Sequence, residues 1–493
     1  MSKDLRIYEH PILDFKRGKK VKFYFEGRVI EAYSNESILA SLYAIGIKVF
    51  SWSTKLHRPR GAFCMIGKCS SCLAYIDGIP NRRLCIEPSR DGIVVERQRG
   101  IPKVNTSTNI SDEEVNIEEL STDLLIIGGG PAGLQAALKA SNLGMDIILV
   151  DEGLRLGGQL VKQTHKFFGI KRYYGGLRGF EIAEKLSKKI KELENVRVFT
   201  STSVYGYFRG GVIGAYSRLP KPLNLIIKPK AVIVATGAME RYLEFENNDL
   251  PGIMGAGAAQ TLMNQYGIRP GDNALIIGSG NVGLLITYQL LQAGVNVKGV
   301  VEVMNEIGGW FVHAAKIKRL GIPIILEHTI VKALGRDEVE AAVIQMVKGG
   351  KLVPGTEKVV QTDLVLLAVG LTPDTRFFEQ AGCVMRWIPE LGGLVPLRTW
   401  NLETSIKNLF VAGDASGIEE ATTAFIEGEI AALSAALNLG FGSSREEIER
   451  SKLIDFIWNV YRASPLLRRA RIGKLKATVS DEEMDKIRRG FHE

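Results

Sequence analysis

The sequence predicts an α/β fold in which two dinucleotide-binding units follow a small N-terminal β-grasp domain. Each of the two units has a buried strand, a glycine-rich turn, a helix and a second strand that ends in an acidic residue. The small domain is predicted because residues 20–100 alternate between apolar and polar positions around a short helix and a group of cysteines. At 493 residues the chain is too long for one hydrophobic core, so several domains are expected.

These patterns divide the chain into five expected regions. Residues 1–100 form the β-grasp domain, 101–120 a polar linker, 121–250 with 365–440 the first nucleotide domain, 251–364 the second nucleotide domain, and 441–493 a charged helical tail. Within the β-grasp domain, VKFYFEGRVIEAY predicts two strands joined at Glu26–Gly27. SILASLYAIGI predicts a helix, and CLAYIDG, LCIEP and GIVVERQ predict further strands.

Four of the five cysteines follow the pattern C-x4-C-x2-C-x12-C: Cys64, Cys69, Cys72 and Cys85. A ferredoxin-type loop holds a [2Fe–2S] cluster in this way, with three thiolates from one tight loop and a fourth from a later segment. Zinc sites usually have two short C-x2-4-C pairs, and disulfides are rare in an ordinary cytosol. The four cysteines are therefore candidate cluster ligands, with zinc, a disulfide pair or a vestigial site as alternatives.

The first glycine-rich turn is Gly128-x-Gly130-x-x-Gly133, and Asp151 ends the following strand. The glycines permit a tight turn, close approach of a pyrophosphate and packing of the helix on the strand, while the helix N-terminus attracts phosphate. The candidate residues for an adenine nucleotide, either FAD or ATP, are Gly128, Gly130, Pro131, Ala132, Gly133, Asp151, Glu152, Gly158 and Gln159. The alternative is a glycine turn kept only for packing.

The second turn is Gly278-x-Gly280-x-x-Gly283, with Glu302 at the end of its second strand. An acid at that position favours NAD over NADP, because it repels a 2′-phosphate. NAD is therefore the candidate ligand, and a fold retained without its ligand is the alternative.

Composition excludes several other classes of protein. The net charge is +9, but Lys and Arg are mixed with Asp and Glu along the chain, so no nucleic-acid partner is expected. No apolar run is long enough to cross a bilayer, and the first residues lack a signal-peptide core. We expect a cytoplasmic protein, possible membrane association as part of a complex, and a composition that fits a thermophile.

Two further segments, ATGAMER (235–241) and VAGDAS (411–416), resemble the ATG and GD motifs of flavoproteins with two dinucleotide-binding domains. The resemblance implies a glutathione-reductase-like fold with an added N-terminal ferredoxin-like domain. It places Ala235, Thr236 and Gly237 near an FAD, and Gly413 and Asp414 on the ribityl chain. No C-x-x-C or C-x4-C lies beside either glycine turn, so electrons leaving a flavin need an acceptor other than a disulfide.

A closer resemblance rests on HRPRGAFCMIGKCSSCLAYIDGIPN and GAMERYLEFENNDLPGIMGAGAAQTLMNQYGIRPGDNALIIGSGNVG. Both are similar to the α subunits of heteromeric amine oxidoreductases: sarcosine oxidase, the opine oxidases, hydrogen cyanide synthase and the archaeal dye-linked L-proline dehydrogenases. The chain length points to the last of these.

The resemblance implies an enzyme subunit that acts with CH–NH donors. A partner β subunit would carry its own FAD and the substrate site, an FMN would lie at the subunit interface, and an external acceptor would take the electrons. A self-sufficient NADH-dependent flavin oxidoreductase is the alternative. No catalytic residue is expected in this chain, because its histidines stand singly.

Overall fold

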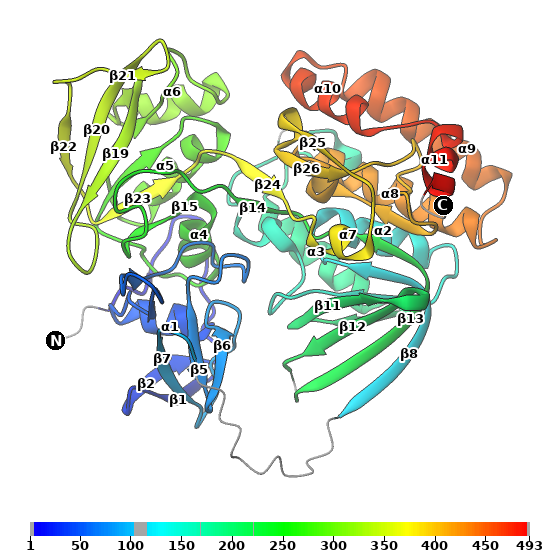
Figure 1. The fold of residues 1–493 in the computed structure, drawn as a ribbon, viewed down its shortest axis with the longest axis horizontal. Helices are drawn as coiled ribbons and strands as arrows, with labels where there is room; N and C mark the ends of the chain where they lie inside the picture. Colours follow the sequence, from blue (N-terminus) through cyan, green and yellow to red (C-terminus); the bar gives the residue numbers. More distant parts are fainter. Residues whose placement is uncertain (1–3, 103–115, 168, 220, 491–493) are drawn as a thin grey trace. The chain divides into compact units, whose positions relative to one another are not determined.

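The structure is a computed structural model that describes residues 4–102, 116–167, 169–219 and 221–490. Most of the expected linker, residues 103–115, lies outside the described residues. The chain forms two compact units (Figure 1): Met1–Ser111 with Glu240–Gly370, and Asp112–Met239 with Leu371–Glu493. Two short strands, β14 (Ala238–Glu240) and β24 (Leu371–Pro373), lie where the chain passes between the units.

The first unit begins with a small mixed sheet and one helix. The elements are β1 (Lys20–Phe25), β2 (Arg28–Tyr33), α1 (Ile38–Ala44), β3 (Ser51–Trp52), β4 (Pro59–Arg60), β5 (Leu73–Ile76), β6 (Ile79–Arg83) and β7 (Val94–Arg99). β1 and β2 are antiparallel and join at Glu26–Gly27, as predicted. The expected strand LCIEP is wrong: residues 84–88 turn beneath α1, where the carbonyls of Leu84 and Glu87 accept hydrogen bonds from its first amides. These carbonyls satisfy a helix end and are not available to a strand partner.

The same unit contains the second nucleotide domain. Its elements are β15 (Ile253–Gly255), α4 (Ala256–Gln260), the π-helical turn η4 (Thr261–Gln265), β16 (Asn273–Ile277), α5 (Asn281–Gln292), β17 (Asn296–Val301), α6 (Phe311–Arg319), β18 (Ile324–Ile325), β19 (His328–Leu334), β20 (Ala341–Lys348), β21 (Lys351–Leu352), β22 (Lys358–Gln361) and β23 (Leu364–Leu367). The parallel sheet has the order β15-β23-β16-β17-β18, and its central strands are buried on both faces.

The small domain and the second nucleotide domain share one hydrophobic core. The Tyr43 hydroxyl donates to the Pro270 carbonyl at 2.5 Å, and a Cβ on Gly61 would lie 2.9 Å from the Pro251 Cα. The cysteine-bearing domain is therefore packed on the second nucleotide domain within its unit.

The second unit contains the first nucleotide domain and the C-terminal region. Its elements are β8 (Ile117–Ile127), α2 (Pro131–Ser141), β9 (Ile147–Val150), α3 (Gly179–Lys191), β10 (Val196–Phe199), β11 (Thr202–Phe208), β12 (Val212–Ser217), β13 (Leu223–Val234), α7 (Arg376–Ala381), β25 (Met385–Ile388), β26 (Gly393–Pro396), β27 (Leu409–Val411), α8 (Ala421–Asn438), α9 (Ser444–Asp455), α10 (Arg468–Ala477) and α11 (Asp481–Gly490).

The sheet of this unit has the order β10-β9-β8-β13-β12-β11, and β27 lies beside the end of β13. β8 begins at Ile117, inside the segment expected to be a linker, because its first residues pair with the start of β13. Helix α8 packs on α2 so closely that a Cβ on Gly428 would lie 2.2 Å from the Ala132 carbonyl oxygen. None of the described helices is both long and apolar enough to cross a membrane.

Candidate functional site

The first glycine turn is fixed by the close approach of neighbouring backbone. A Cβ on Gly128 would lie 2.3 Å from the Ala235 carbonyl oxygen, and a Cβ on Gly133 would lie 1.8 Å from the Gly128 carbonyl oxygen. Gly130 caps α2, and Pro131 occupies its first turn. The turn therefore leaves the amides of a helix N-terminus facing a cradle without side chains, which fits a pyrophosphate.

The acid after β9 lies directly on this turn. Asp151 accepts a hydrogen bond from the Gly129 amide at 2.6 Å and another from the Gly153 amide at 2.7 Å. Two further predicted residues, Gly158 and Gln159, begin the 3-10 turn η1 (Gly158–Lys162), where a Cβ on Gly158 would lie 2.8 Å from the Gly130 Cα. Glu152 accepts a hydrogen bond from the Ser203 hydroxyl at 3.1 Å.

The ATG and GD segments reach the same region. They follow β13 and β27, which lie on the opposite side of β8 from β9. Gly237 accepts a hydrogen bond from the Asp374 amide at 2.9 Å, and Thr236 donates to the Asp374 carbonyl at 2.8 Å. A Cβ on Gly413 would lie 3.1 Å from the Cβ of Ala132 at the start of α2. Five segments distant in sequence thus surround the N-terminus of α2.

The GD loop rests on a buried ionic network that sequence reasoning missed. One carboxylate oxygen of Glu427 accepts from the Gly413 amide at 3.0 Å and the Ser416 hydroxyl at 2.7 Å. The other accepts from Arg462 at 2.5 Å and from Lys474 at 2.8 Å. Burial would raise the pKa of Glu427, but Lys474 and Arg462 lower it to about 2. The C-terminal helices therefore hold the GD loop.

Loss of hydration raises the pKa of Asp414, the acid of the GD loop, to about 6. Its carboxylate accepts a hydrogen bond from the Glu419 amide at 3.2 Å. Asp414 is thus half ionised near pH 6, whereas Glu427 ionises at far lower pH.

The second glycine turn repeats the geometry of the first. A Cβ on Gly278 would lie 2.4 Å from the Ala368 carbonyl oxygen, and a Cβ on Gly283 2.0 Å from the Gly278 carbonyl oxygen. Gly280 caps α5. The Glu302 carboxylate accepts hydrogen bonds from the Ser279 amide at 2.8 Å and the Ser279 hydroxyl at 2.7 Å.

A second pair of glycines, also missed from the sequence, closes on this turn. A Cβ on Gly309 would lie 2.9 Å from the Asn281 nitrogen, and the Gly308 amide donates to the Ser279 hydroxyl at 3.0 Å. The signal was available: a Gly-Gly pair begins six residues after the strand-end acid in both halves, Asp151 and Glu302.

Three cysteines of the small domain lie in one loop, and Cys85, which follows β6, approaches them. The Gly67 amide donates to the Cys85 sulfur at 3.2 Å, and the Lys68 amide donates to the Cys64 sulfur at 3.4 Å. Met65 and Ser70 hold φ near +56° and +59°, so the loop turns sharply at two of its non-glycine residues. Backbone amides directed at sulfur are the environment that an iron–sulfur cluster uses.

The thiols are also within hydrogen-bonding reach of one another. Hydrogen bonds from Cys69 and Cys85 hold the pKa of Cys64 well below its usual range. Bonding to Cys64, together with burial, raises the pKa of Cys69 and of Cys85. No group of three or more His, Cys, Asp or Glu residues in the described ranges is arranged around one metal ion. A [2Fe–2S] cluster does not require three protein ligands around one ion, because its four cysteines are divided between two irons.

An aromatic pair borders the cysteine loop. The rings of Phe63 and Tyr242 stack with centroids 4.3 Å apart and an interplanar angle of 13°. Burial and the nearby thiols Cys69 and Cys64 raise the pKa of Tyr242, and its hydroxyl hydrogen-bonds Cys69. Tyr242 follows the ATG segment in sequence but lies in the unit that holds the cysteines.

Comparison with known families agrees with this architecture. Residues 122–428 match the family described as pyridine nucleotide-disulphide oxidoreductase, and residues 18–100 match the 2Fe-2S iron-sulfur cluster binding domain. The chain belongs to the pyridine nucleotide-disulphide oxidoreductase family and carries an N-terminal 2Fe-2S-binding domain. The predicted fold class, a glutathione-reductase-like flavoprotein core with a ferredoxin-like domain, is confirmed.

Several curated relatives are named as subunits of oxidases or of a synthase. The alpha subunit of sarcosine oxidase from Rhizobium meliloti (strain 1021) is 25% identical over 86% of this chain and 46% of that protein. An opine oxidase subunit from Rhizobium meliloti is 30% identical over 65% of this chain and 64% of that protein. The HcnB subunit of hydrogen cyanide synthase from Pseudomonas aeruginosa is 27% identical over 66% of this chain and 73% of that protein. The chain thus spans about half the length of the sarcosine oxidase relative.

Solved structures show the same fold. The L-proline dehydrogenase from P. horikoshii aligns with a TM-score of 0.65 and 24% identity over 90% of this chain and 79% of that chain. Thioredoxin reductase from T. acidophilum aligns with a TM-score of 0.51 and 22% identity over 65% of this chain and 99% of that chain. The second alignment omits about a third of this chain, in agreement with an added domain outside the flavoprotein core.

Proposed function

We propose that this chain is the electron-transfer subunit of a heteromeric flavin-dependent dehydrogenase that oxidises an amine or amino acid, with L-proline as the first candidate substrate. The observation that carries the proposal is a combination of features. Four clustered cysteines occur in a chain that has two glycine-rich nucleotide turns, and the first of these turns has no redox disulfide beside it. Each of the five cysteines is a free thiol. The fifth, Cys383, is buried, and its thiol donates a hydrogen bond to the Thr404 hydroxyl. Relatives named as oxidase and synthase subunits support the class.

The residues divide the work in this proposal. Gly128, Gly130 and Gly133 would accommodate the phosphates of an adenine nucleotide, FAD or ATP, and Asp151, which holds the turn through the Gly129 amide, would bind the ribose. The ribityl chain of a flavin would meet Asp414. A flavin supplies the conversion between two-electron and one-electron transfer, and the cysteine loop supplies thiolates for a one-electron [2Fe–2S] carrier.

The substrate would be oxidised on a partner that carries its own FAD, with an FMN at the interface and an external acceptor taking the electrons. The support is that several relatives are named as subunits, and a subunit acts together with a partner chain. Glu427, the most perturbed acid near the first turn, is fully engaged by Arg462, Lys474 and the GD loop.

The test is reconstitution. The full chain is purified anaerobically alone and after co-expression with a candidate FAD-bearing subunit, and iron, acid-labile sulfide and flavin are quantified. Dye reduction is then measured with L-proline, sarcosine and glycine. Amine-dependent dye reduction should require both chains, and Cys64→Ser should abolish the iron and the dye reduction together. A stable homo-oligomer that reduces dye without a partner contradicts the proposal.

The intact second turn, with Glu302 at its edge, supports a second candidate: an NADH-dependent flavin oxidoreductase. Rapid mixing of the purified chain with NADH under argon separates the two candidates. Bleaching of the flavin absorbance within the turnover time supports the second candidate, and unchanged absorbance removes it.

A further inference from the structure

An arginine in the second unit is buried without a counter-ion. The side chain of Arg398 is 1% exposed, and its Nε has no hydrogen-bond partner. The one hydrogen bond found for its guanidinium within the described residues is a long one, from Nη1 to the Pro396 carbonyl at 3.4 Å. No carboxylate among the described residues lies within ion-pair distance of it, since every ion pair found in this region joins other cations. A buried charge in this state is costly, and arginine does not relieve the cost by losing its proton.

The neighbouring carboxylates are already engaged. Glu427 and Glu419 both pair with Arg462, at 2.5 Å and 2.7 Å, and Lys474 approaches Glu427 at 2.8 Å. Glu419 and Glu427 are therefore taken up by Arg462 and Lys474, and Arg398 is left outside these ion pairs. Burial lowers the pKa of Arg398 to about 10, which leaves it charged at neutral pH. Asp414, whose pKa of about 6 leaves it mostly ionised at neutral pH, adds a third carboxylate to this region, but none of the three pairs directly with Arg398.

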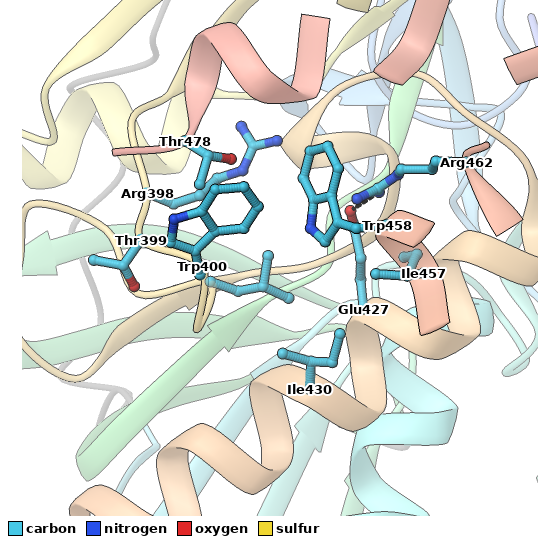
Figure 2. A pocket seen from close by; sticks show the side chains of 10 residues that line it. Arg398, Thr399, Trp400, Glu427, Ile430, Ile457, Trp458, Arg462 and Thr478 are labelled. Atoms are coloured by element: carbon cyan, nitrogen blue, oxygen red, sulfur yellow. Dashed lines mark hydrogen bonds and ion pairs between the residues drawn. The ribbon is translucent and has the colours of Figure 1, made fainter. Parts of the chain in front are cut away.

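A small cavity adjoins this arginine (Figure 2). It measures about 10 Å³ and is lined by Arg398, Thr399, Trp400, Leu402, Glu427, Ile430, Ile457, Trp458, Arg462 and Thr478. The indole rings of Trp400 and Trp458 meet edge to face with centroids 5.0 Å apart. The volume suits one water molecule or one ion of similar size. Of the charged groups in its lining, Glu427 and Arg462 pair with each other, and Arg398 is the cation that has no ion pair.

The backbone holds this arginine rigidly at the junction with the C-terminal helices. The Arg398 amide donates to the Ala477 carbonyl at 3.1 Å, and the Val479 amide donates to the Arg398 carbonyl at 3.0 Å. Two backbone hydrogen bonds thus tie the Arg398 main chain to the tail.

We propose that this cavity binds a single monovalent inorganic anion, chloride in solution, with Arg398 as its principal ligand. The ion gives Arg398 the close counter-charge that no carboxylate provides and fastens the segment after β26 to α10 beside the network that holds the GD loop. Larger anions such as gluconate exceed the cavity and are excluded.

The test compares salts at constant ionic strength. The urea midpoint of the full chain should rise with chloride or bromide, level off as the site saturates, and stay constant in gluconate. Arg398→Met should remove this dependence. Arg386→Met is the matched control, because Arg386 is exposed on β25 and contacts the tail through the Lys476 carbonyl; it should keep the full chloride response.

Crystals soaked in bromide give a measurement that needs no variant. An anomalous peak in the cavity beside Arg398 supports the site. Equal midpoints in chloride and gluconate, together with no anomalous peak, mean that a water molecule fills the cavity and overturn the proposal. An unchanged chloride response in Arg398→Met overturns it as well, because the salt would then act elsewhere.

Discussion

Replacing Glu427 with Gln isolates the charge that holds the GD loop. Glutamine has the same shape and keeps a carbonyl oxygen that can accept from the Gly413 amide and the Ser416 hydroxyl. The substitution removes the negative charge and leaves Lys474 and Arg462 buried beside a neutral group. Breaking one side of a buried ionic network is strongly destabilising, because the remaining charges lose their compensation.

The size of the effect follows from the pKa of Glu427. It falls from an ordinary 4.5 to about 2, chiefly because Lys474 and Arg462 outweigh the opposing effect of burial. At about 1.36 kcal/mol for each pKa unit, the charged form contributes about 3 kcal/mol to the free energy of unfolding near neutral pH. Because the folded pKa is the lower one, this contribution is complete above about pH 4.5 and is lost as the pH falls toward 2.

The assay is urea unfolding of the wild-type chain and Glu427→Gln from neutral pH to about pH 3, followed by tryptophan fluorescence, since Trp458 lies beside the network. The variant should be about 3 kcal/mol less stable at neutral pH, and the gap should narrow as acid is added. Glu482→Gln, an exposed acid on α11, is the matched control and should show no such gap. A gap under about 1 kcal/mol, or one that does not depend on pH, would refute the reasoning.

Three further changes test other parts of the molecule. Gly133→Ala should abolish nucleotide binding by the first site, measured by isothermal titration with ADP, because its Cβ would lie 1.8 Å from the Gly128 carbonyl oxygen; unchanged affinity contradicts the assignment. Tyr242→Phe should make the reduction potential of the anaerobically loaded cysteine loop more negative by removing a hydrogen bond to Cys69, as read by redox titration of the EPR signal; an equal potential denies the contact any tuning role. Asp414→Asn should stabilise the chain by up to about 3 kcal/mol at about pH 8, because an acid whose folded pKa is raised from 3.8 to about 6 opposes folding as it ionises; the gain should vanish below about pH 4, and a gain that persists there is inconsistent with this cause.

The local motifs could be predicted from the sequence because their constraints act over a few residues. Gly133 is required by the Gly128 carbonyl five positions earlier, and Gly283 by the Gly278 carbonyl at the same spacing. The cysteine pattern is local in the same sense, since three of its four members lie within one loop. Steric constraints between residues close in sequence fix the spacing of these glycines, and this spacing does not depend on the rest of the fold.

The ionic network and the anion cavity had no such signal. Glu427 forms ion pairs with Arg462 and Lys474, which lie 35 and 47 positions away in the sequence. Nothing near any of the three residues in the sequence distinguishes it from an ordinary surface charge. The burial of Arg398 could not be predicted from the sequence either, because a basic residue between strands is usually exposed. The expected strand at LCIEP failed for a related reason: its carbonyls are used by α1, a tertiary demand that alternation does not encode.

The class of the chain follows from local sequence features: two glycine turns with strand-end acids, four clustered cysteines, and no cysteine pair beside either turn. The contacts that support these local features depend on the tertiary structure. It packed the cysteine-bearing domain on the second nucleotide domain in one core, and it placed the C-terminal helices where Arg462 and Lys474 hold the GD loop through Glu427. The physical reason is that turn sterics depend on neighbours in sequence, whereas buried charges depend on which distant segments exclude water around them.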